Sequence, residues 1–590
     1  MSALQHLITE HIDIWTAADT EKKSGRGRAS SNAGSVYGIK KLRELILELA
    51  VRGKLVPQNA NDEPASELIK RIQTEKAKLV AEGKIRKDKP LGVIIEAEKI
   101  FDLPNGWEWV RFNDYATDIS TGPFGSMIHQ SDYVVGGIPL INPSHMIGDE
   151  IVPDESISVS TEMARKLGAY TIYKGDIVMA RRGEVGRIAL VTSKENGWLC
   201  GTGSFALRFS NEIHRDYLRV LFRCVYARTY LAGEAVGTTM VNLNHGILKK
   251  MPIGLPPLEE QHRIVAKVDE LMALCDQLEA QHSNAADAHE QLVSHLLGTL
   301  TQSQDAADFN TNWQRIATHF DTLFTTESSI DVLKQTLLQL AVMGKLVPQD
   351  PNDEPASELL KQIQIEKAKL IAEGKIKKDK PLSEIGEIEK PYQLPKGWNW
   401  ARMIDCAQQI TDGEHLTPER TVDSTKIPLV TAKNVRDGNM DYTDTDFVDF
   451  HIAAKCWNRC KPELNDILIV SVGATIGRLT IIDDHRDMVI VRSVTLIKPL
   501  QIHIPYLALA LRSPLLQKSI WAGVKQNAQP CLYLSVSTNL PIPVPPLSEQ
   551  RRIIAKIGEL MSLCDQLKSR ITDVRLCRQK LADVLVTNVV

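Results

Sequence analysis

Two stretches of this 590-residue chain each occur twice. Residues 42–91 and 333–382 share 37 identical residues over 50 aligned positions, and residues 252–281 and 541–570 share 19 over 30. The two long segments enclosed by these repeats have diverged almost completely. The chain is therefore predicted to fold as two similar halves, each with a repeated frame around an insert of its own. A duplicated frame offers two equivalent docking sites, so one kind of partner can bind twice about an approximate two-fold axis.

The first repeat of each half is predicted to be helical. Leu42, Leu45, Ile46 and Leu49 lie on one helical stripe, and a second amphipathic helix follows and stops near Gly83. The charged runs Lys84–Lys89 and Lys375–Lys380 come next. A solvated linker or a partner contact is the favoured interpretation of these runs, and contact with a DNA backbone is the alternative.

The inserts show a different pattern, of short β-like runs separated by Gly and Pro. One pattern survives in both: Asp176-Ile177 precedes Gly183 and Gly186, and Asp466-Ile467 precedes Gly473 and Gly477. We therefore expect each insert to be one mixed α/β domain, with the same topology in both and with different surface loops.

Each second repeat leads into a long helix with apolar residues at alternating steps of four and three, the spacing of a coiled coil. The predicted coiled-coil positions are Ile264, Val268, Leu271, Leu278, Ile553, Ile557, Leu560 and Leu567. The leaders PPLEEQ and PPLSEQ place Pro before each helix and Glu in its first turn, a typical helix start. An antiparallel pair is the simplest arrangement, and two independent core helices are the alternative.

The segment before the first repeat also has a weak counterpart. Residues 7–18 match residues 315–326 at an offset of 308, against 291 in the strong repeat. The difference of 17 is about the length of the Gly/Ser/basic linker near residues 22–34, which the second copy would lack.

Composition and motifs exclude several classes of protein. The chain has no apolar run of membrane-spanning length and no secretory signal pattern, so we expect a cytoplasmic protein with reduced cysteines. It carries no GxxxxGK[ST], no GxGxxG after a strand, no Asn/Asp-Pro-Pro-Tyr tetrad, no HExxH and no GxSxG. Net charge is −3, and each insert has 15 basic and 15 acidic residues, so any DNA affinity depends on how charge is arranged.

Together these features resemble the specificity subunit of type I restriction–modification enzymes. The resemblance covers nearly the whole chain and rests on the two-insert, two-repeat layout, the LPNGWEW and LPKGWNW segments and the PPLEEQ and PPLSEQ leaders. The block LAVRGKLVPQ…NDEPASEL points further, to a type IB-like subclass whose type member is the A-type enzyme of enteric bacteria.

The resemblance implies an α+β protein, with two mixed α/β target recognition domains separated by a pair of long antiparallel coiled-coil helices and a pseudo-two-fold internal repeat. It implies a non-catalytic subunit whose target recognition domains each read one half of a split, asymmetric DNA site, with the coiled coil as spacer. Two modification subunits for adenine methylation would bind the repeats, and two restriction subunits would join through that core. S-adenosylmethionine, ATP and Mg are expected in the partner subunits and no cofactor in this chain. The alternatives are a self-contained DNA-modifying enzyme and a coiled-coil adaptor that does not touch DNA.

Five domains follow from this layout. They are an N-terminal helical region with the first repeat (1–106), target recognition domain 1 (107–255), a central region with the long helix and then the helical repeat (256–397), target recognition domain 2 (398–545) and a C-terminal coiled-coil helix (546–590).

Base-edge readers need polar or basic side chains on exposed loops. In the first insert the candidates are Ser126, His129, Asn142, His145, Arg181, Arg182, Thr238, Thr239 and Asn242. In the second they are His415, Thr417, Lys433, Asn434, Ser471, Thr475, Arg492, Ser493, Asn527 and Gln529. The histidines have no partnering cluster, so neither a metal site nor a catalytic site is predicted.

A loop with no obvious core role has stayed identical across the duplication, which favours partner binding. Its residues are Leu55, Pro57, Asp62, Glu63 and Pro64, matched by Leu346, Pro348, Asp353, Glu354 and Pro355. The alternative is that these residues cap the local helix pair.

Overall fold

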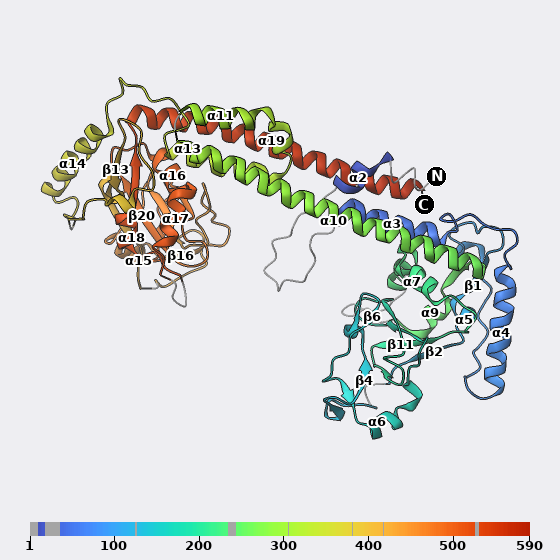
Figure 1. Ribbon diagram of the computed structural model, residues 1–590. Helices are drawn as coiled ribbons and strands as arrows, with labels where there is room; N and C mark the ends of the chain where they lie inside the picture. Colours follow the sequence, from blue (N-terminus) through green and yellow to red (C-terminus); the bar gives the residue numbers. More distant parts are fainter. Residues whose placement is uncertain are drawn as a thin grey trace. The chain divides into compact units, whose positions relative to one another are not determined.

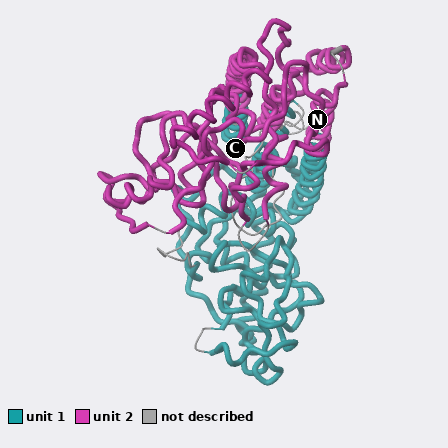
Figure 2. Tube along the Cα trace, turned by 90° about the vertical axis from the view of Figure 1, so that its left-hand side faces the viewer, with its two compact units in different colours: residues 1–285, 574–590 teal, residues 286–573 magenta. Residues whose placement is uncertain are grey.

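The structure is a computed structural model that describes residues 10–17, 36–123, 127–233, 243–304, 306–379, 381–416, 418–525 and 530–589. The chain forms two compact units (Figure 2). Unit 1 comprises residues 1–285 and 574–590, and unit 2 comprises residues 286–573.

A pair of helices forms the frame of each unit (Figure 1). They are α3 (Tyr37–Val51) and α4 (Ala65–Ala81) in unit 1, and α13 (Glu327–Val342) and α14 (Ala356–Ala372) in unit 2. The predicted stripe of Leu42, Leu45, Ile46 and Leu49 is buried in the core of unit 1. Helix α3 therefore packs its apolar face against the insert, and the burial of this face stabilises the helix.

A two-stranded ribbon closes each insert. Strand β1 (Glu108–Arg111) pairs antiparallel with β12 (Pro252–Leu255), and β13 (Asn399–Arg402) pairs antiparallel with β21 (Pro541–Val544). The first strand of each insert thus pairs with its last, so both ends of the insert leave the frame at the same place.

Each insert contains a four-stranded antiparallel sheet with the same strand order. In unit 1 the order is β2 (Asp118–Thr121), β11 (Ser204–Arg208), β8 (Ile177–Ala180) and β9 (Ile188–Leu190). In unit 2 it is β14 (Ala407–Asp412), β20 (Val494–Pro499), β17 (Ile467–Val470) and β18 (Leu479–Ile481). Strands β8 and β17 are buried along their whole length, as their continuous apolar runs require.

A second, smaller sheet lies in each insert. In unit 1 its order is β10 (Leu199–Cys200), β4 (Ile138–Ile141), β7 (Ser158–Val159) and β3 (Tyr133–Val134), beside the hairpin of β5 (Met146–Ile147) and β6 (Glu150–Ile151). In unit 2 its order is β16 (Asp446–Val448), β15 (Ile427–Val430) and β19 (Val489–Ile490). The parallel pair β4–β10 recurs as β15–β19, which confirms the predicted common topology.

Short helices complete the inserts. Those of unit 1 are α5 (Phe112–Tyr115), α6 (Thr161–Lys166), α7 (Arg215–Arg223), α8 (Val225–Gly233) and α9 (His245–Lys250). Those of unit 2 are α15 (Phe450–Trp457), α16 (Ile504–Arg512), α17 (Pro514–Ala522) and α18 (Leu534–Asn539).

Two long helices follow the inserts. Helix α10 (Leu258–Gln302) begins in unit 1 and ends in unit 2, whereas α19 (Leu547–Val589) begins in unit 2 and ends in unit 1. Of the predicted coiled-coil positions, Ile264, Val268, Leu271, Ile553 and Ile557 are buried, and Leu278, Leu560 and Leu567 are partly buried. All eight belong to or pack against the core of their unit, so the predicted apolar stripe is confirmed.

Matching ion pairs hold the frame on these long helices. Arg43 of α3 contacts Asp276 of α10 at 2.5 Å, and at the matching positions Lys334 of α13 pairs with Asp565 of α19. Both pairs are accessible to solvent, so they contribute little to the free energy of unfolding. We infer that they orient the frame helix on the long helix.

The weak N-terminal match stays a prediction, because residues 7–9 and 18 lie outside the described residues, but one helical turn recurs in both copies. In α2 (Ile12–Ala17) the His11 carbonyl accepts hydrogen bonds from the amides of Ile14 and Trp15. The His319 carbonyl before α12 (Phe320–Leu323) accepts them from Thr322 and Leu323, each 308 residues later. In the described part, α11 (Ala306–Thr318) leads into this second copy.

Candidate nucleic-acid interface

Five segments of the first insert meet at one end of its larger sheet. The Gly122 amide donates to the Ser204 carbonyl at 3.1 Å, and the Ser204 hydroxyl donates to the Ile141 carbonyl at 2.9 Å. The Arg181 amide donates to the Gly203 carbonyl at 3.0 Å, and the Leu243 amide donates to the Arg181 carbonyl at 2.9 Å. These bonds gather segments that lie over 100 residues apart in the sequence. We call this end of the sheet the loop edge.

The second insert has the same loop edge. The Ser471 amide donates to the Ser493 carbonyl at 2.9 Å, and the Leu532 amide donates to the Ser471 carbonyl at 2.8 Å. Ser471 therefore occupies the position of Arg181. The Gly413 amide donates to the Val494 carbonyl at 3.1 Å, as Gly122 does in the first insert. The backbone of the loop edge is thus the same in both inserts, although its side chains differ.

The loop edge of the first insert presents two adjacent arginines. Arg182 is exposed, and the guanidinium of Arg181 lies 5.5 Å from the centre of the Phe205 ring. Burial and the charge of Arg182 lower the pKa of Arg181. An anion or a base acceptor that approached this pair would relieve their repulsion. His129 is also exposed, on the segment that follows Gly122.

The loop edge of the second insert carries a different set of side chains. Lys433 and Arg492 are exposed, and Lys433 pairs with Asp444 at 3.0 Å. Thr475 is partly buried, and the Ser493 hydroxyl accepts a hydrogen bond from the Ala432 amide at 3.3 Å. The loop edge of the first insert therefore carries adjacent arginines, and that of the second mixes lysine, arginine and hydroxyl groups.

His415 lies in a small charged cluster at the same edge. Its Nε2 is 2.6 Å from a carboxylate oxygen of Asp412, which also pairs with Arg459. Burial opposes ionisation of Asp412, but the hydrogen bonds from Arg459 and His415 outweigh it and lower the pKa of that carboxyl. The cluster fixes the orientation of the His415 ring, which is 54% exposed.

The comparisons with known proteins agree on one family. The model of the type I restriction modification DNA specificity domain matches residues 104–287 and 417–574. The chain is 40% identical to the type I restriction enzyme EcoAI specificity subunit of Escherichia coli and 38% identical to the EcoEI specificity subunit, over 99% of both chains in each case. The chain belongs to the type I restriction enzyme specificity subunits.

A solved structure of the HsdS subunit from Thermoanaerobacter tengcongensis is also similar. It is 19% identical, covers 83% of this chain and 98% of its own, and has a TM-score of 0.40.

Three residues of this specificity subunit that the sequence predicted as base readers are buried, contrary to expectation. His145 and Asn434 occupy matching turns, where their side chains accept hydrogen bonds from the amides of Asn142 and Thr431. Ser471 is 2% exposed, and its hydroxyl donates to the Arg492 carbonyl. These polar side chains are used inside the fold to satisfy backbone groups, which is why they are buried. Asn142 is partly buried in the same turn.

The remaining candidates for base contact lie outside the described residues. They are Ser126, Thr238, Thr239, Asn242, Thr417, Asn527 and Gln529. They stay predictions.

Several of the loop residues predicted for partner binding have roles within the subunit. Leu55 is buried, Leu346 packs against the core of unit 2, and Pro64 and Pro355 start helices α4 and α14. Asp62 and Asp353 pair with arginines of the long helices, and Glu63 pairs with Arg71. Pro57, Pro348 and Glu354 are exposed. Pro64 and Pro355 thus stand at the N-cap positions of the local helices, whereas Asp62 and Asp353 bind the long helices, and partner binding by these residues stays a prediction.

Sequence reasoning missed two ion pairs at the end of strands β8 and β17 that lies opposite the loop edge. Asp176 pairs with Arg208 of β11, and Asp466 pairs with Lys498 of β20 at 2.7 Å. Each aspartate also accepts a hydrogen bond from an amide of its own turn. The aspartate of the Asp-Ile pattern that both inserts share is the sequence signal from which these ion pairs could have been predicted.

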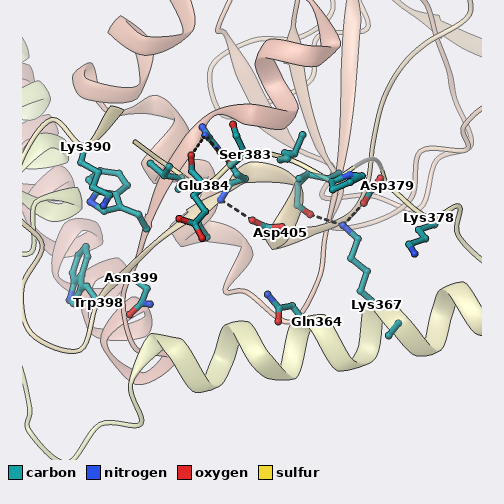
Figure 3. A pocket seen from close by; sticks show the side chains of 18 of the residues that line it. Gln364, Lys367, Lys378, Asp379, Ser383, Glu384, Lys390, Trp398, Asn399 and Asp405 are labelled. Atoms are coloured by element: carbon teal, nitrogen blue, oxygen red, sulfur yellow. Dashed lines mark hydrogen bonds and ion pairs between the residues drawn. The ribbon is translucent and has the colours of Figure 1, made fainter. Parts of the chain in front are cut away.

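A surface groove of about 770 Å³ lies between α14 and the connector that follows it (Figure 3). It is lined by apolar side chains such as Leu382, Leu394 and Trp400 together with charged ones. Fourteen of its twenty lining residues are identical at the matching position 291 residues earlier, although several are exposed. This retention at exposed positions marks the repeated part of the subunit as a candidate docking surface.

Within the described part of the chain, no helix is long and apolar enough to cross a membrane. No group of three or more His, Cys, Asp or Glu side chains among those residues is placed to hold a metal ion.

Proposed function

We propose that this subunit is the non-catalytic DNA-reading subunit of a type I restriction–modification complex. Each target recognition domain reads one half of an asymmetric bipartite DNA site, and the long helices set the spacer between the halves. The repeats dock two modification subunits, which methylate adenine, and two restriction subunits join for DNA cleavage. S-adenosylmethionine, ATP and Mg act in those partners.

The observation that carries this proposal is one loop edge built twice with unlike side chains. The backbone hydrogen bonds at Arg181 and Ser471 are the same, yet one side chain is a cation and the other a buried hydroxyl. Equal backbones place both edges equivalently on a duplex, while unlike side chains meet different base edges. Two half-sites of different sequence follow.

The repeated frame supports docking of two copies of one partner. Fourteen of the twenty residues that line the groove of Figure 3 recur in the sequence of unit 1. Similar surfaces favour the same partner, so two modification subunits fit the duplication.

Methylome sequencing with and without this gene tests the proposal. One bipartite adenine-methylated motif is expected to disappear on deletion and return on complementation. Exchange of residues 107–255 for another insert is expected to change one half of that motif only. An unaltered methylome beside an active partner methyltransferase would disprove the function.

A further inference from the structure

A short basic segment follows the second frame helix in each unit. We call residues 84–89 and 375–379 the basic turns. Helix α4 ends at Ala81, and Gly83 adopts a φ of 68°, so the chain reverses and the Lys84 amide caps the Leu79 carbonyl at 2.9 Å. Helix α14 ends in the same way at Gly374, whose φ is 69°. The two turns thus have the same backbone.

An aspartate anchors each basic turn to the insert. Asp88 contacts Lys76 at 3.2 Å and Lys249 at 2.5 Å, and Asp379 contacts Lys367 at 2.7 Å. Lys367 also donates to the Ile404 carbonyl at 2.8 Å. Each basic turn is therefore held in place by ion pairs of its aspartate, and its basic side chains point into solvent.

Most cations of the basic turns have no acidic partner. Arg86, Lys87 and Lys89 are exposed and make no ion pair with any residue that the structure describes in unit 1. Lys377 and Lys378 are likewise exposed and unpaired among the described residues of unit 2. In Figure 3, Lys378 stands beside the Lys367–Asp379 pair with no interaction drawn. By contrast, Lys70 of the same repeat pairs with Glu67, and Lys99, just beyond the repeat, pairs with Glu96.

The charge of the turns has been retained across the duplication. Lys84 and Lys87 match lysines, and Arg86 matches Lys377, which keeps the charge and changes the shape. Beyond Leu91 the identity falls to 7 of the next 15 positions, 92–106 against 383–397. A solvated linker needs no particular charge at a given position, so this retention indicates a ligand that selects positive charge rather than a fixed shape.

The first basic turn is joined to the loop edge through one short helix. Its anchor Lys249 is in α9, whose start follows Leu243, and the Leu243 amide is bonded to the Arg181 carbonyl. Six helical residues span about 9 Å. The backbone of the anchor Lys249 therefore lies within about 12 Å, the width of a DNA major groove, of the backbone at Leu243 of the loop edge.

We propose that the basic turns bind the phosphodiester backbone of duplex DNA beside each half-site. This inference rests on the proposed function. Each insert is charge-neutral, so the loop edges alone supply little of the phosphate binding that dominates affinity. Arg and Lys are interchangeable at a phosphate that is met as a point charge, which fits the exchange between Arg86 and Lys377. Such contacts fix the position of the subunit on DNA and read no sequence.

Salt-dependent binding tests this site in the complete complex with its modification subunits. One variant carries Arg86→Gln, Lys87→Gln, Lys89→Gln, Lys377→Gln and Lys378→Gln. The control carries Lys70→Gln, Lys166→Gln, Lys267→Gln, Lys361→Gln and Lys556→Gln, five lysines that are paired with acids. The probes are a fluorescent duplex of arbitrary sequence and one with the motif found by methylome sequencing.

For the first variant, the slope of log Kobs against log salt is expected to fall by about 0.9 for each phosphate that the subunit no longer neutralises. Both probes should lose affinity by the same factor, and the control should keep the wild-type slope. An unchanged slope with loss of the modification subunits would show a protein-docking surface instead. An unchanged slope with a lower melting temperature would show a helix-capping role. An equal fall in the control would show an effect of total charge, and each of these three results overturns the proposal.

The experiment distinguishes failure of the proposed function from failure of the proposed phosphate contact. If the wild-type complex shows no preference for the bipartite motif, DNA reading is disproved whatever the slope. If the preference is present and the variant keeps its slope, only the phosphate contact is disproved.

Discussion

Arg263 in the first turns of helix α10 donates two hydrogen bonds to Asp62, through Nη1 at 3.4 Å and Nη2 at 2.6 Å. Arg552 of α19 repeats the pair with Asp353, at 3.2 and 2.6 Å. The side chains of Asp62 and Asp353 are only 6% and 8% exposed. The loop that is identical across the duplication is thus fastened to the start of each long helix.

Asp62→Asn is expected to destabilise unit 1 by about 2 kcal/mol, because it removes charge-assisted hydrogen bonds from a buried group. Asp353→Asn should do the same in unit 2. Chemical unfolding of the full chain measures both effects. Lys70→Gln, which breaks an exposed pair with Glu67, serves as control and should change stability by less than about 1 kcal/mol. Weaker partner binding at unaltered stability would instead assign Asp62 to docking.

Two glycine pairs separate backbone strain from a steric clash. Gly53 and Gly344 have φ of 66° and 69°, and an added Cβ would lie 2.4 Å from Cγ of Pro104 or Pro395. Gly83→Ala should cost about 1–2 kcal/mol, because its φ is also positive but no atom lies within 4 Å of its Cβ.

Gly53→Ala is expected to cost more than Gly83→Ala, since it adds the clash to the same strain. Thermal melting of the two variants gives the comparison directly. Equal losses of stability would mean that Pro104 moves aside freely, contrary to its close approach to Gly53.

Two matching histidines predict a loss of stability in mild acid. His214 and His503 precede helices α7 and α16, and each has a buried Nδ1 without a hydrogen-bond partner in the described part. Burial and the neighbouring His262 lower the pKa of His214, and burial and Arg551 lower that of His503. The positive end of each helix dipole acts in the same direction.

Because the folded state favours the neutral rings, their contribution to stability is complete above the unfolded pKa of about 6.5. It is lost as the pH falls from there through the lower folded-state values. In the double variant His214→Gln and His503→Gln, the free energy of unfolding should depend less steeply on pH below about 6.5. The control His485→Gln changes an exposed residue and should leave this pH dependence unaltered. If the free energy of unfolding of the double variant fell as steeply with pH as that of the wild type, the acid sensitivity would not come from His214 and His503.

Periodicity and duplication sufficed to predict the helices, the common topology and the coiled-coil positions. They could not tell a polar residue on a loop surface from one turned inward, because both have the same local sequence signature. His145 and Asn434 illustrate this, since each follows a buried strand and caps the next turn. Only the tertiary contacts show that their hydrogen bonds are already used. The loop edge itself was beyond prediction, because backbone bonds such as Arg181 to Gly203 join remote segments.

Single-residue changes at the loop edges should act on one half-site each. Arg182→Ala should relax sequence preference in the half read by the first insert, and Arg492→Ala in the other half, by about 1–3 kcal/mol for each base that is no longer read. Competition binding with duplexes mutated in one half-site measures both effects. The untouched half-site is the internal control. Equal weakening on all sequences would assign that arginine to a phosphate.

The long helices predict a spacer that follows helix length. Four residues inserted near Leu278 of α10 or Leu567 of α19 lengthen that helix by about 6 Å, close to two base-pair steps of about 3.4 Å. The methylated motif should then carry a spacer longer by about two base pairs.

A seven-residue insertion keeps the apolar heptad pattern of the helix in register. This second variant tests the prediction even if the four-residue insertion prevents assembly of the complex. It should lengthen the spacer by about three base pairs, since seven residues add roughly 10 Å. The same residues inserted into the Gly/Ser-rich segment 22–34 should leave the spacer as it is, because that segment lies outside both long helices. Methylome sequencing reads all three variants, and an active complex with an unaltered spacer in the helix variants would show that the helices are not the ruler.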